Sequence, residues 1–415
     1  MTSYLLKNFP GKDELIFEFE SIPEPEIPQV NGHVHTPYSF SSFFSMSQIF
    51  EQALEENVRV LGINDFFMAD GYNDFYELAH DNKIFPMFNI EIVGLLSKEQ
   101  NKNIRINDPN NPGRTYISGK GLDFPFELDP ALECMLHNIR YENQIHTKEI
   151  IDNANRIIQE IDLHLALKYS EIKRLFAKDF VSERHVSRAI RALVYARCPK
   201  SPERKDFLNL LCGEMGFNAD LNDLAAVENE IRSKLLKSGG RAYVLEDSSA
   251  FLPVPEVLQI ILNAGGIPCY PVLLDDESGR CTEYEANKQI LHNELIAHRI
   301  HCIEFIPYRN DVGILRDYVD FFHKNGFVIT FGTAHSTPDN KPLRVTTRDG
   351  KFLDEELAAV SQEGASIIAA HQYLRVRGEQ GYLDIDGNPR KEKMNEFITL
   401  GKAVIHKFIS RETSY

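Results

Sequence analysis

The sequence predicts an α/β fold, a β/α barrel interrupted by a helical insertion, and three observations support this prediction. Short apolar runs alternate with amphipathic helical patterns from residue 28 to about 95, which is typical of β-α-β units. The alternation stops after residue 95, the patterns are almost wholly helical from about 126 to 240, and the alternation returns over 250–345. The chain of 415 residues is also long enough for one barrel of about 250 residues with additions.

The first part of the chain, residues 1–95, contains three strand-and-helix units. Strands are predicted at 28–36, 58–67 and 83–95, and helices at 45–58 and 70–82. Ser45 or Ser47 is placed to cap the first of these helices, because a serine hydroxyl can accept from the free backbone N–H groups of a first turn. Three such units in succession favour a parallel sheet or a barrel.

The middle and the end of the chain follow a different pattern. Residues 101–125 are dense in Asn, Pro and Gly and predict a loop or a hairpin insertion. With the amphipathic stretches at 146–165 and 182–198, this predicts that 96–249 forms a loop plus a helical insertion or lid. The second barrel segment, 250–345, shows helix and strand patterns at 255–274, 298–308, 314–327 and 328–336. Residues 346–415 predict an extension that packs on the barrel and ends in a helix.

Composition excludes several classes of protein. The 61 acidic and 45 basic residues give a formal net charge of −16, which argues against general binding to nucleic-acid backbone. No stretch approaches the roughly 18 apolar residues of a membrane span. Lys7, Lys12 and Asp13 stand where a secretory signal needs apolar residues. Six cysteines without a CxxC motif fit reduced thiols, so we expect a soluble, cytoplasmic protein of unspecified oligomeric state.

Polar residues stand at the ends of the predicted strands, where ligand-facing residues gather in parallel α/β folds. They are His33 and His35, Asn64 and Asp65, Glu91, Asp275 or Asp276, Glu304 and His335. Two histidines at i and i+2 on a strand project from the same face, which suits one metal ion or two adjacent ions. Mixed imidazole and carboxylate ligands favour Zn, Mn or Fe, so the pattern predicts a site for a divalent metal.

Five segments in chain order resemble the PHP (polymerase and histidinol phosphatase) family: GHVHTPYS, LGINDFFMADGY, FNIEI, NAGGIPCYP and FGTAHS. The resemblance covers roughly residues 28–95 and 255–340. It implies a distorted β/α barrel of the TIM type with about seven strands, which holds roughly two or three metal ions and hydrolyses phosphate esters. A further segment, SERHVSRAIRAL, resembles a motif in the helical insert of some members, and this implies that His185 points at metal or phosphate.

The sequence departs from the family's pattern at about four positions where the resemblance implies metal ligands. Phe40, Phe66, Tyr270 and Thr333 stand at those positions. The remaining residues predict a reduced site for one or two ions, with His33, His35, Glu91 and His335 as metal ligands. The predicted catalytic residues are His185 and Asp65, the latter as an acceptor that orients an imidazole.

Three residues are candidates for binding substrate. Arg184 and Arg188 lie on one face of the helix that carries His185, where they could bind a phosphate; the alternative is a solvated face paired with acidic residues. Tyr270 could contact substrate, or it could be a hydrogen-bonding residue that fills a vacated metal position.

Two functions remain open at this stage. The first is a metal-dependent phosphoesterase that hydrolyses a phosphate ester of a small molecule or nucleotide. The alternative is a catalytically inactive barrel that serves as a binding or regulatory module, because Phe40 and Phe66 cannot ligate a metal. Metal-dependent hydrolysis distinguishes the two.

Overall fold

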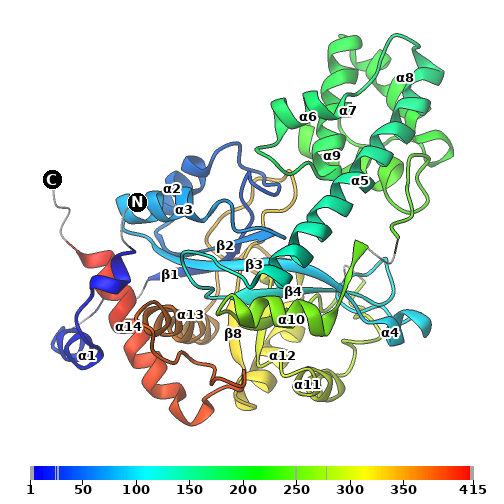
Figure 1. The fold of residues 1–415 in the computed structure, drawn as a ribbon. Coiled ribbons are helices and arrows are strands. Elements are labelled where there is room, and N and C mark those ends of the chain that lie inside the picture. Colours follow the sequence, from blue (N-terminus) through cyan, green and yellow to red (C-terminus); the bar gives the residue numbers. More distant parts are fainter. Residues whose placement is uncertain (1–3, 24, 26–27, 248–249, 277, 412–415) are drawn as a thin grey trace.

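The centre of the molecule is a nearly closed, barrel-shaped sheet of seven strands (Figure 1). The structure is a computed structural model that describes residues 4–23, 25, 28–247, 250–276 and 278–411. The strands, in their order around the barrel, are β1 (Gln29–Val34), β2 (Val58–Phe66), β3 (Phe85–Leu95), β4 (Arg114–Lys120), β6 (Ile267–Pro271), β7 (Cys302–Phe305) and β8 (Val328–Phe331). A short strand, β5 (Leu252–Pro253), pairs with β3 alone. The predicted α/β barrel with a helical insertion is therefore confirmed.

The barrel closes between β1 and the segment that follows β8. Val34 pairs in parallel with Ala334, and the backbone N–H of His35 donates to the carbonyl of Ala334 at 2.7 Å. Gly332 permits this approach, because a Cβ there would lie 2.3 Å from the Cβ of His33. The closure brings the first and last strands of the barrel together at the predicted metal ligands.

Strand β4 differs from the rest of the barrel, because it runs antiparallel to both of its neighbours, β3 and β6. Residues 101–125 were expected to be a loop or a hairpin insertion, and the hairpin is the form that the structure has. The strand is part of the barrel wall, however, and not an addition outside it. The sequence hides this role, since Ser118 and Lys120 are polar residues that are nonetheless fully buried.

Helices surround the sheet on its outer side. They are α1 (Lys12–Glu20), α2 (Met46–Glu55), α3 (Tyr72–Asp81), α4 (Ser97–Asn101), α10 (Val254–Asn263), α11 (Lys288–Ala297), α12 (Val312–Lys324), α13 (Glu355–Val376) and α14 (Met394–Ser410). Ser45 caps α2, where its hydroxyl accepts from the backbone N–H of Gln48. Helix α13 was not predicted, because it is buried along most of its length and therefore lacks the apolar stripe of a surface helix.

Residues between β4 and β5 form a group of helices at one end of the molecule (Figure 1). These are α5 (Pro130–Ile161), α6 (Tyr169–Phe176), α7 (Glu183–Arg197), α8 (Ser201–Cys212), α9 (Leu224–Ile231) and the π-helical turn η3 (Arg232–Leu236). They share an apolar core that includes Ile158, Ile190 and Leu208. We call residues 130–236 the helical insert. The division of the whole chain into barrel, insertion and extension stays a proposal.

Short 3-10 turns complete the described elements: η1 (Leu5–Asn8), η2 (Gly213–Met215), η5 (Pro307–Arg309) and η6 (Lys391–Lys393). All six cysteines are free thiols, as expected. Across the described ranges, no helix combines the length and the apolar character needed to cross a bilayer.

Candidate metal centre

Three predicted ligands meet at the end of the barrel. The Nε2 atoms of His33 and His35 lie 3.1 Å apart. The Oε2 atom of Glu91 lies 3.2 Å from Nε2 of His35 and 3.9 Å from Nε2 of His33. Among the described residues, these three form the one group of His, Cys, Asp or Glu side chains close enough to share an ion. All three side chains are buried.

The tautomer of His33 follows from its neighbour Glu304. The Nδ1 atom of His33 lies 2.7 Å from Oε2 of Glu304, and a carboxylate can only accept. His33 therefore carries its proton on Nδ1 and a lone pair on Nε2. The side-chain nitrogen of Asn64 lies 3.2 and 3.0 Å from the two ring nitrogens, so it sits over the face of the imidazole and leaves the in-plane lone pair free.

His35 is oriented in the same sense by a second chain of hydrogen bonds. Ser39 donates its hydroxyl proton to Oδ1 of Asp65 at 2.6 Å, so its oxygen accepts from Nδ1 of His35 at 3.3 Å. Asp65 also accepts from the backbone N–H and the hydroxyl of Thr36. The predicted role of Asp65 as an acceptor behind an imidazole matches this geometry, although the contact passes through Ser39. His35 therefore carries its proton on Nδ1, and its Nε2 has a free lone pair, as in His33.

The donor set fits a divalent cation. Two imidazole lone pairs and a carboxylate oxygen converge within 4 Å of one another, and none of the three can donate a proton to the others. Such a group is repulsive unless a cation lies between its members. Two histidines and one carboxylate with open positions suit Zn, Mn or Fe. Phe66 stacks on His35 with ring centroids 4.4 Å apart and makes that side of the group apolar.

Behind His33, an ion pair fills the interior of the barrel. The ammonium of Lys120 lies 2.6 Å from Oε1 of Glu304, and both side chains are fully buried. Burial alone would raise the pKa of Glu304, but the charge of Lys120 and the hydrogen bonds from His33 and Lys120 outweigh it and lower that pKa to about 2. Glu304 therefore remains an acceptor. Glu304 was predicted at the end of a strand, without a role in the site.

His335 was also predicted to bind metal, and the structure places it apart from the other three. Its Nε2 donates to the carbonyl of Lys341 at 2.8 Å, and its Nδ1 accepts from the hydroxyl of Thr333 at 2.8 Å. Asn31 in turn donates to that hydroxyl. Burial lowers the pKa of His335 to about 4. Because both ring nitrogens are engaged, binding a metal would require these bonds to break, and the ligand role stays a prediction.

His185 has a structural task at the start of α7. Its Nδ1 accepts from the backbone N–H of Ser182 at 3.0 Å, which makes it the N3 partner in a capping box at the first turn of α7. The ring packs against Phe40, which lines the cavity described below, at a centroid distance of 4.9 Å. Burial, followed by the charge of Arg188, lowers the pKa of His185 to about 3. Its catalytic role stays a prediction.

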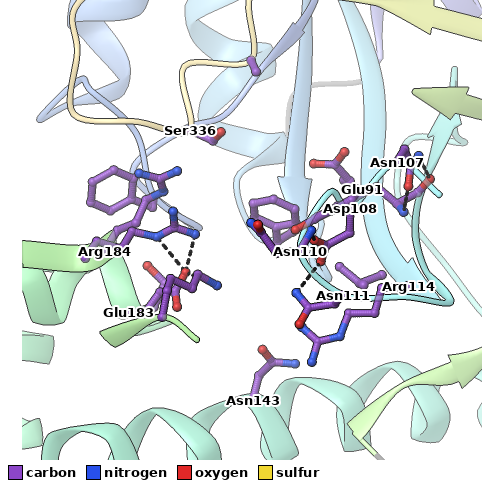
Figure 2. A pocket seen from close by; sticks show the side chains of 18 of the residues that line it. Glu91, Asn107, Asp108, Asn110, Asn111, Arg114, Asn143, Glu183, Arg184 and Ser336 are labelled. Atoms are coloured by element: carbon purple, nitrogen blue, oxygen red, sulfur yellow. Dashed lines mark hydrogen bonds and ion pairs between the residues drawn. The ribbon is translucent and has the colours of Figure 1, made fainter. Parts of the chain in front are cut away.

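A cavity of about 550 Å³ opens above the three candidate metal ligands. His33, His35 and Glu91 line it from the barrel, and the helical insert lines it from the opposite side. Figure 2 shows Glu183 and Arg184 on one side and Asp108, Asn111 and Arg114 on the other, with Asn143 reaching in from α5. The insert therefore forms a wall over the candidate metal centre.

Two arginines in this cavity have no anionic partner. Among the described residues, no carboxylate lies within ion-pair distance of Arg184 or Arg309. Burial, followed by the nearby charge of Arg232, lowers the pKa of Arg184 to about 9, although the charge of Glu183 acts in the opposite direction. Arg309 lies close enough to interact electrostatically with both Glu91 and Arg184. The cavity therefore presents unsatisfied positive charge near the metal ligands.

The other arginines of α7 do not share this property. Arg188 and Arg191 both pair with Glu228, at 3.2 and 2.8 Å. Arg188 also lies over the ring of Phe40 at 4.8 Å. Of the two open interpretations of this helix face, phosphate binding fits Arg184 and pairing with an acid fits Arg188. A direct contact between Arg188 and substrate stays a prediction.

Tyr270 points away from the cavity. Its hydroxyl donates to Oε1 of Glu285 at 2.6 Å, and the side chain is buried. Glu285 also accepts from the backbone N–H groups of Leu273 and Leu274. The geometry agrees with the hydrogen-bonding alternative for Tyr270, and its contact with substrate stays a prediction without a supporting distance.

Several residues of the cavity were missed by sequence reasoning. They are Asn107, Asp108, Asn111, Tyr116, Arg232, Lys237 and Arg309. Arg309 follows the end of β7 and could have been found by the same strand-end rule that gave Glu304. The others lie in irregular segments, in an unpredicted strand or in the insert, where no periodic pattern marks the inner side.

Fold and site together define an α/β-barrel protein with a His-His-Glu centre beneath a helical wall. Residues 31–179 match the family model of the PHP domain, in agreement with the family resemblance of the sequence. His185, Glu304 and His335 lie outside the matched segment. The comparison with curated proteins gives no match.

One solved structure agrees in fold. A candidate metal-dependent phosphoesterase from Bifidobacterium adolescentis shares 14% sequence identity with a TM-score of 0.50, over 81% of this chain and 96% of that chain. An amidohydrolase from Chromobacterium violaceum, with bound sulfate and no metal, shares 14% identity with a TM-score of 0.48, over 80% of this chain and 96% of that chain. At this identity, the first likeness supports the fold alone.

Proposed function

We propose that this protein is a metal-dependent hydrolase that cleaves the phosphate ester of a small molecule or nucleotide, with a reduced site that holds one divalent ion. The observation that carries the proposal is the pairing of two features in one cavity: three converging metal ligands and two arginines without counter-ions. The PHP domain and the name of the B. adolescentis protein support it.

His33, His35 and Glu91 would hold the ion. When bound there, a divalent ion supplies an activated water and draws charge from a phosphoryl oxygen. Glu304 and Ser39 keep the two imidazoles in the required tautomer, so the ligands are oriented before an ion arrives. Zn, Mn and Fe are all compatible with this donor set.

Arg184 and Arg309 would bind the phosphoryl oxygens. A guanidinium suits phosphate because it offers paired N–H donors and stays charged. Neither group has to leave a carboxylate first, so their charge is available to the substrate. The helical insert lines the cavity above them, and partial burial there strengthens these interactions.

The test is phosphate release from p-nitrophenyl phosphate and from a panel of sugar phosphates and mononucleotides, with Zn²⁺, Mn²⁺ or Fe²⁺ supplied. We expect metal-dependent turnover in the wild type and about one metal equivalent by elemental analysis. His35→Gln should lose both. Arg184→Met should keep the metal and raise KM.

Arg197→Met is the matched control, since Arg197 is an exposed residue at the far end of the same helix and pairs with Asp162. It should leave KM unchanged. Bound metal without hydrolysis of any phosphate ester would favour the alternative function, a non-catalytic binding or regulatory module. Absence of metal after soaking would overturn both the metal site and the proposed reaction.

A further inference from the structure

Lys120 is the one buried lysine of the barrel interior that the proposed function leaves unexplained, within the residues that the structure describes. Its ammonium lies 2.6 Å from Oε1 of Glu304, 3.3 Å from Oδ1 of Asn64 and 3.5 Å from the carbonyl of Gly32. No part of the side chain is exposed. A buried ion pair is usually less stabilising than a well-packed apolar pair, so its presence at this place calls for another explanation.

The contacts of Lys120 assign different tasks to the two oxygens of Glu304. Oε1 accepts from Lys120, and Oε2 accepts from Nδ1 of His33 at 2.7 Å. Thr330 donates to Oε1 as well, at 3.3 Å. Because the ammonium holds one oxygen, the carboxylate cannot turn, and the other oxygen stays on His33. Lys120 also orients Asn64, because it donates to the side-chain oxygen of Asn64. This turns the amide nitrogen of Asn64 toward the face of His33.

We infer that Lys120 is a positioning residue for the metal centre, which acts through Glu304 to hold the Nε2 lone pair of His33 toward the cavity. This inference rests on the proposed function for its relevance to catalysis. The geometry itself exists without a metal, because it concerns only which ring nitrogen carries the proton. Strand β4 delivers Lys120 to this point, which gives the antiparallel strand a role in the site.

The inference makes an unusual prediction for a pair of variants. In Glu304→Gln, Lys120 still requires an acceptor and takes the amide oxygen, so the amide NH₂ faces Nδ1 of His33. That NH₂ donates, which forces the proton of His33 onto Nε2 and blocks the metal position. In the double variant Lys120→Met with Glu304→Gln, the amide is free to turn its oxygen toward His33. The double variant should therefore bind metal better than Glu304→Gln alone.

The experiment measures Zn²⁺ affinity by competition with a chromophoric chelator, together with the tautomer of His33 in metal-free protein by ¹⁵N NMR of labelled histidines. A His33→Asn spectrum identifies the signal. We expect Glu304→Gln to weaken Zn²⁺ binding about 10–100-fold, as loss of an outer partner does, and to show His33 protonated on Nε2. The double variant should recover about tenfold of this loss and restore protonation on Nδ1.

Lys120→Met and the control Lys178→Met complete the set. Lys178 pairs with Asp74 outside the barrel interior, at 3.1 Å. Lys178→Met should leave Zn²⁺ affinity and the His33 tautomer unchanged, whereas Lys120→Met should weaken binding. If Lys120→Met does not fold, the comparison of Glu304→Gln with the double variant still tests whether Lys120 acts through Glu304 on His33.

The inference is overturned if the double variant binds Zn²⁺ no better than Glu304→Gln, or if the tautomer of His33 is the same in every variant. It fails separately from the proposed function. If the wild type binds no metal, the proposed function is overturned. The tautomer of His33 in metal-free protein would still test the positioning role of Lys120.

Discussion

Two regions of the molecule bury a carboxylate completely and surround it with opposite kinds of neighbour. In the barrel interior, Glu304 lies between the ammonium of Lys120 and the imidazole of His33. Outside the barrel, before α11, Glu285 has neutral partners: the hydroxyl of Tyr270 and two backbone N–H groups. Burial tends to raise the pKa of both carboxyls. The cation beside Glu304 lowers its pKa to about 2, whereas that of Glu285 rises to about 7.

The difference shows what each region can do. A carboxylate that stays charged can orient a metal ligand over the whole physiological pH range, because it never becomes a donor. A carboxyl that titrates near neutral pH serves the packing of a turn and makes stability depend on pH. The four predictions below test this contrast, from the largest expected effect to the smallest.

Glu91→Gln should have the largest effect, because it removes the anionic ligand of the inner region while His33 and His35 stay in place. We expect Zn²⁺ affinity and phosphoesterase turnover to fall by more than the roughly 100-fold typical of outer partners. Elemental analysis and initial rates check this. Unchanged metal content would show that Glu91 is not a ligand.

Lys120→Met should destabilise the protein by about 3–5 kcal/mol, because it leaves Glu304 buried without its partner ion. Urea unfolding followed by circular dichroism measures this change. The control is Arg375→Met, which breaks a pair with Asp123 whose two side chains are 37% and 33% exposed. Solvent screens that pair, so its loss should cost less than about 1 kcal/mol. Equal losses in the two variants would contradict the contrast.

Glu285→Gln should change how stability depends on pH. The pKa of Glu285 rises from 4.5 to about 7 on folding, so the folded state holds its proton more tightly and stability falls as pH rises through this window. A neutral glutamine removes this fall. We expect the variant to gain about 2–3 kcal/mol relative to the wild type between pH 5 and pH 8, measured by urea unfolding at both values. Parallel pH profiles for the two proteins would refute the assignment.

Tyr270→Phe should have the smallest effect, a loss of about 1.5 kcal/mol at pH 8, because the charged form of Glu285 loses one hydrogen bond. KM for phosphate esters should stay the same, since the hydroxyl points away from the cavity. Stability and KM are measured on the same preparation. A higher KM with unchanged stability would instead support the sequence-based prediction that Tyr270 contacts substrate.

Local sequence patterns were enough to predict the strands that carry His33, His35 and Glu91, since alternation and strand ends are properties of neighbouring residues. The same local patterns did not predict strand β4 or helix α13. Lys120 is polar yet faces the interior, and α13 is buried along most of its length, so neither shows the pattern that marks a half-exposed element.

The sequence by itself determined the α/β barrel, the helical character of about 126–240 and four candidate metal ligands, three of which the structure brings together. Only the tertiary structure decided which partners orient them. His33 and Glu304 are 271 residues apart, and no local pattern links them. The same holds for His335 and Tyr270, whose side chains turn to Lys341 and Glu285 and not to the cavity. The sequence identifies a candidate metal ligand by its residue type and position. The direction of its lone pair depends on neighbours that only the folded barrel brings together.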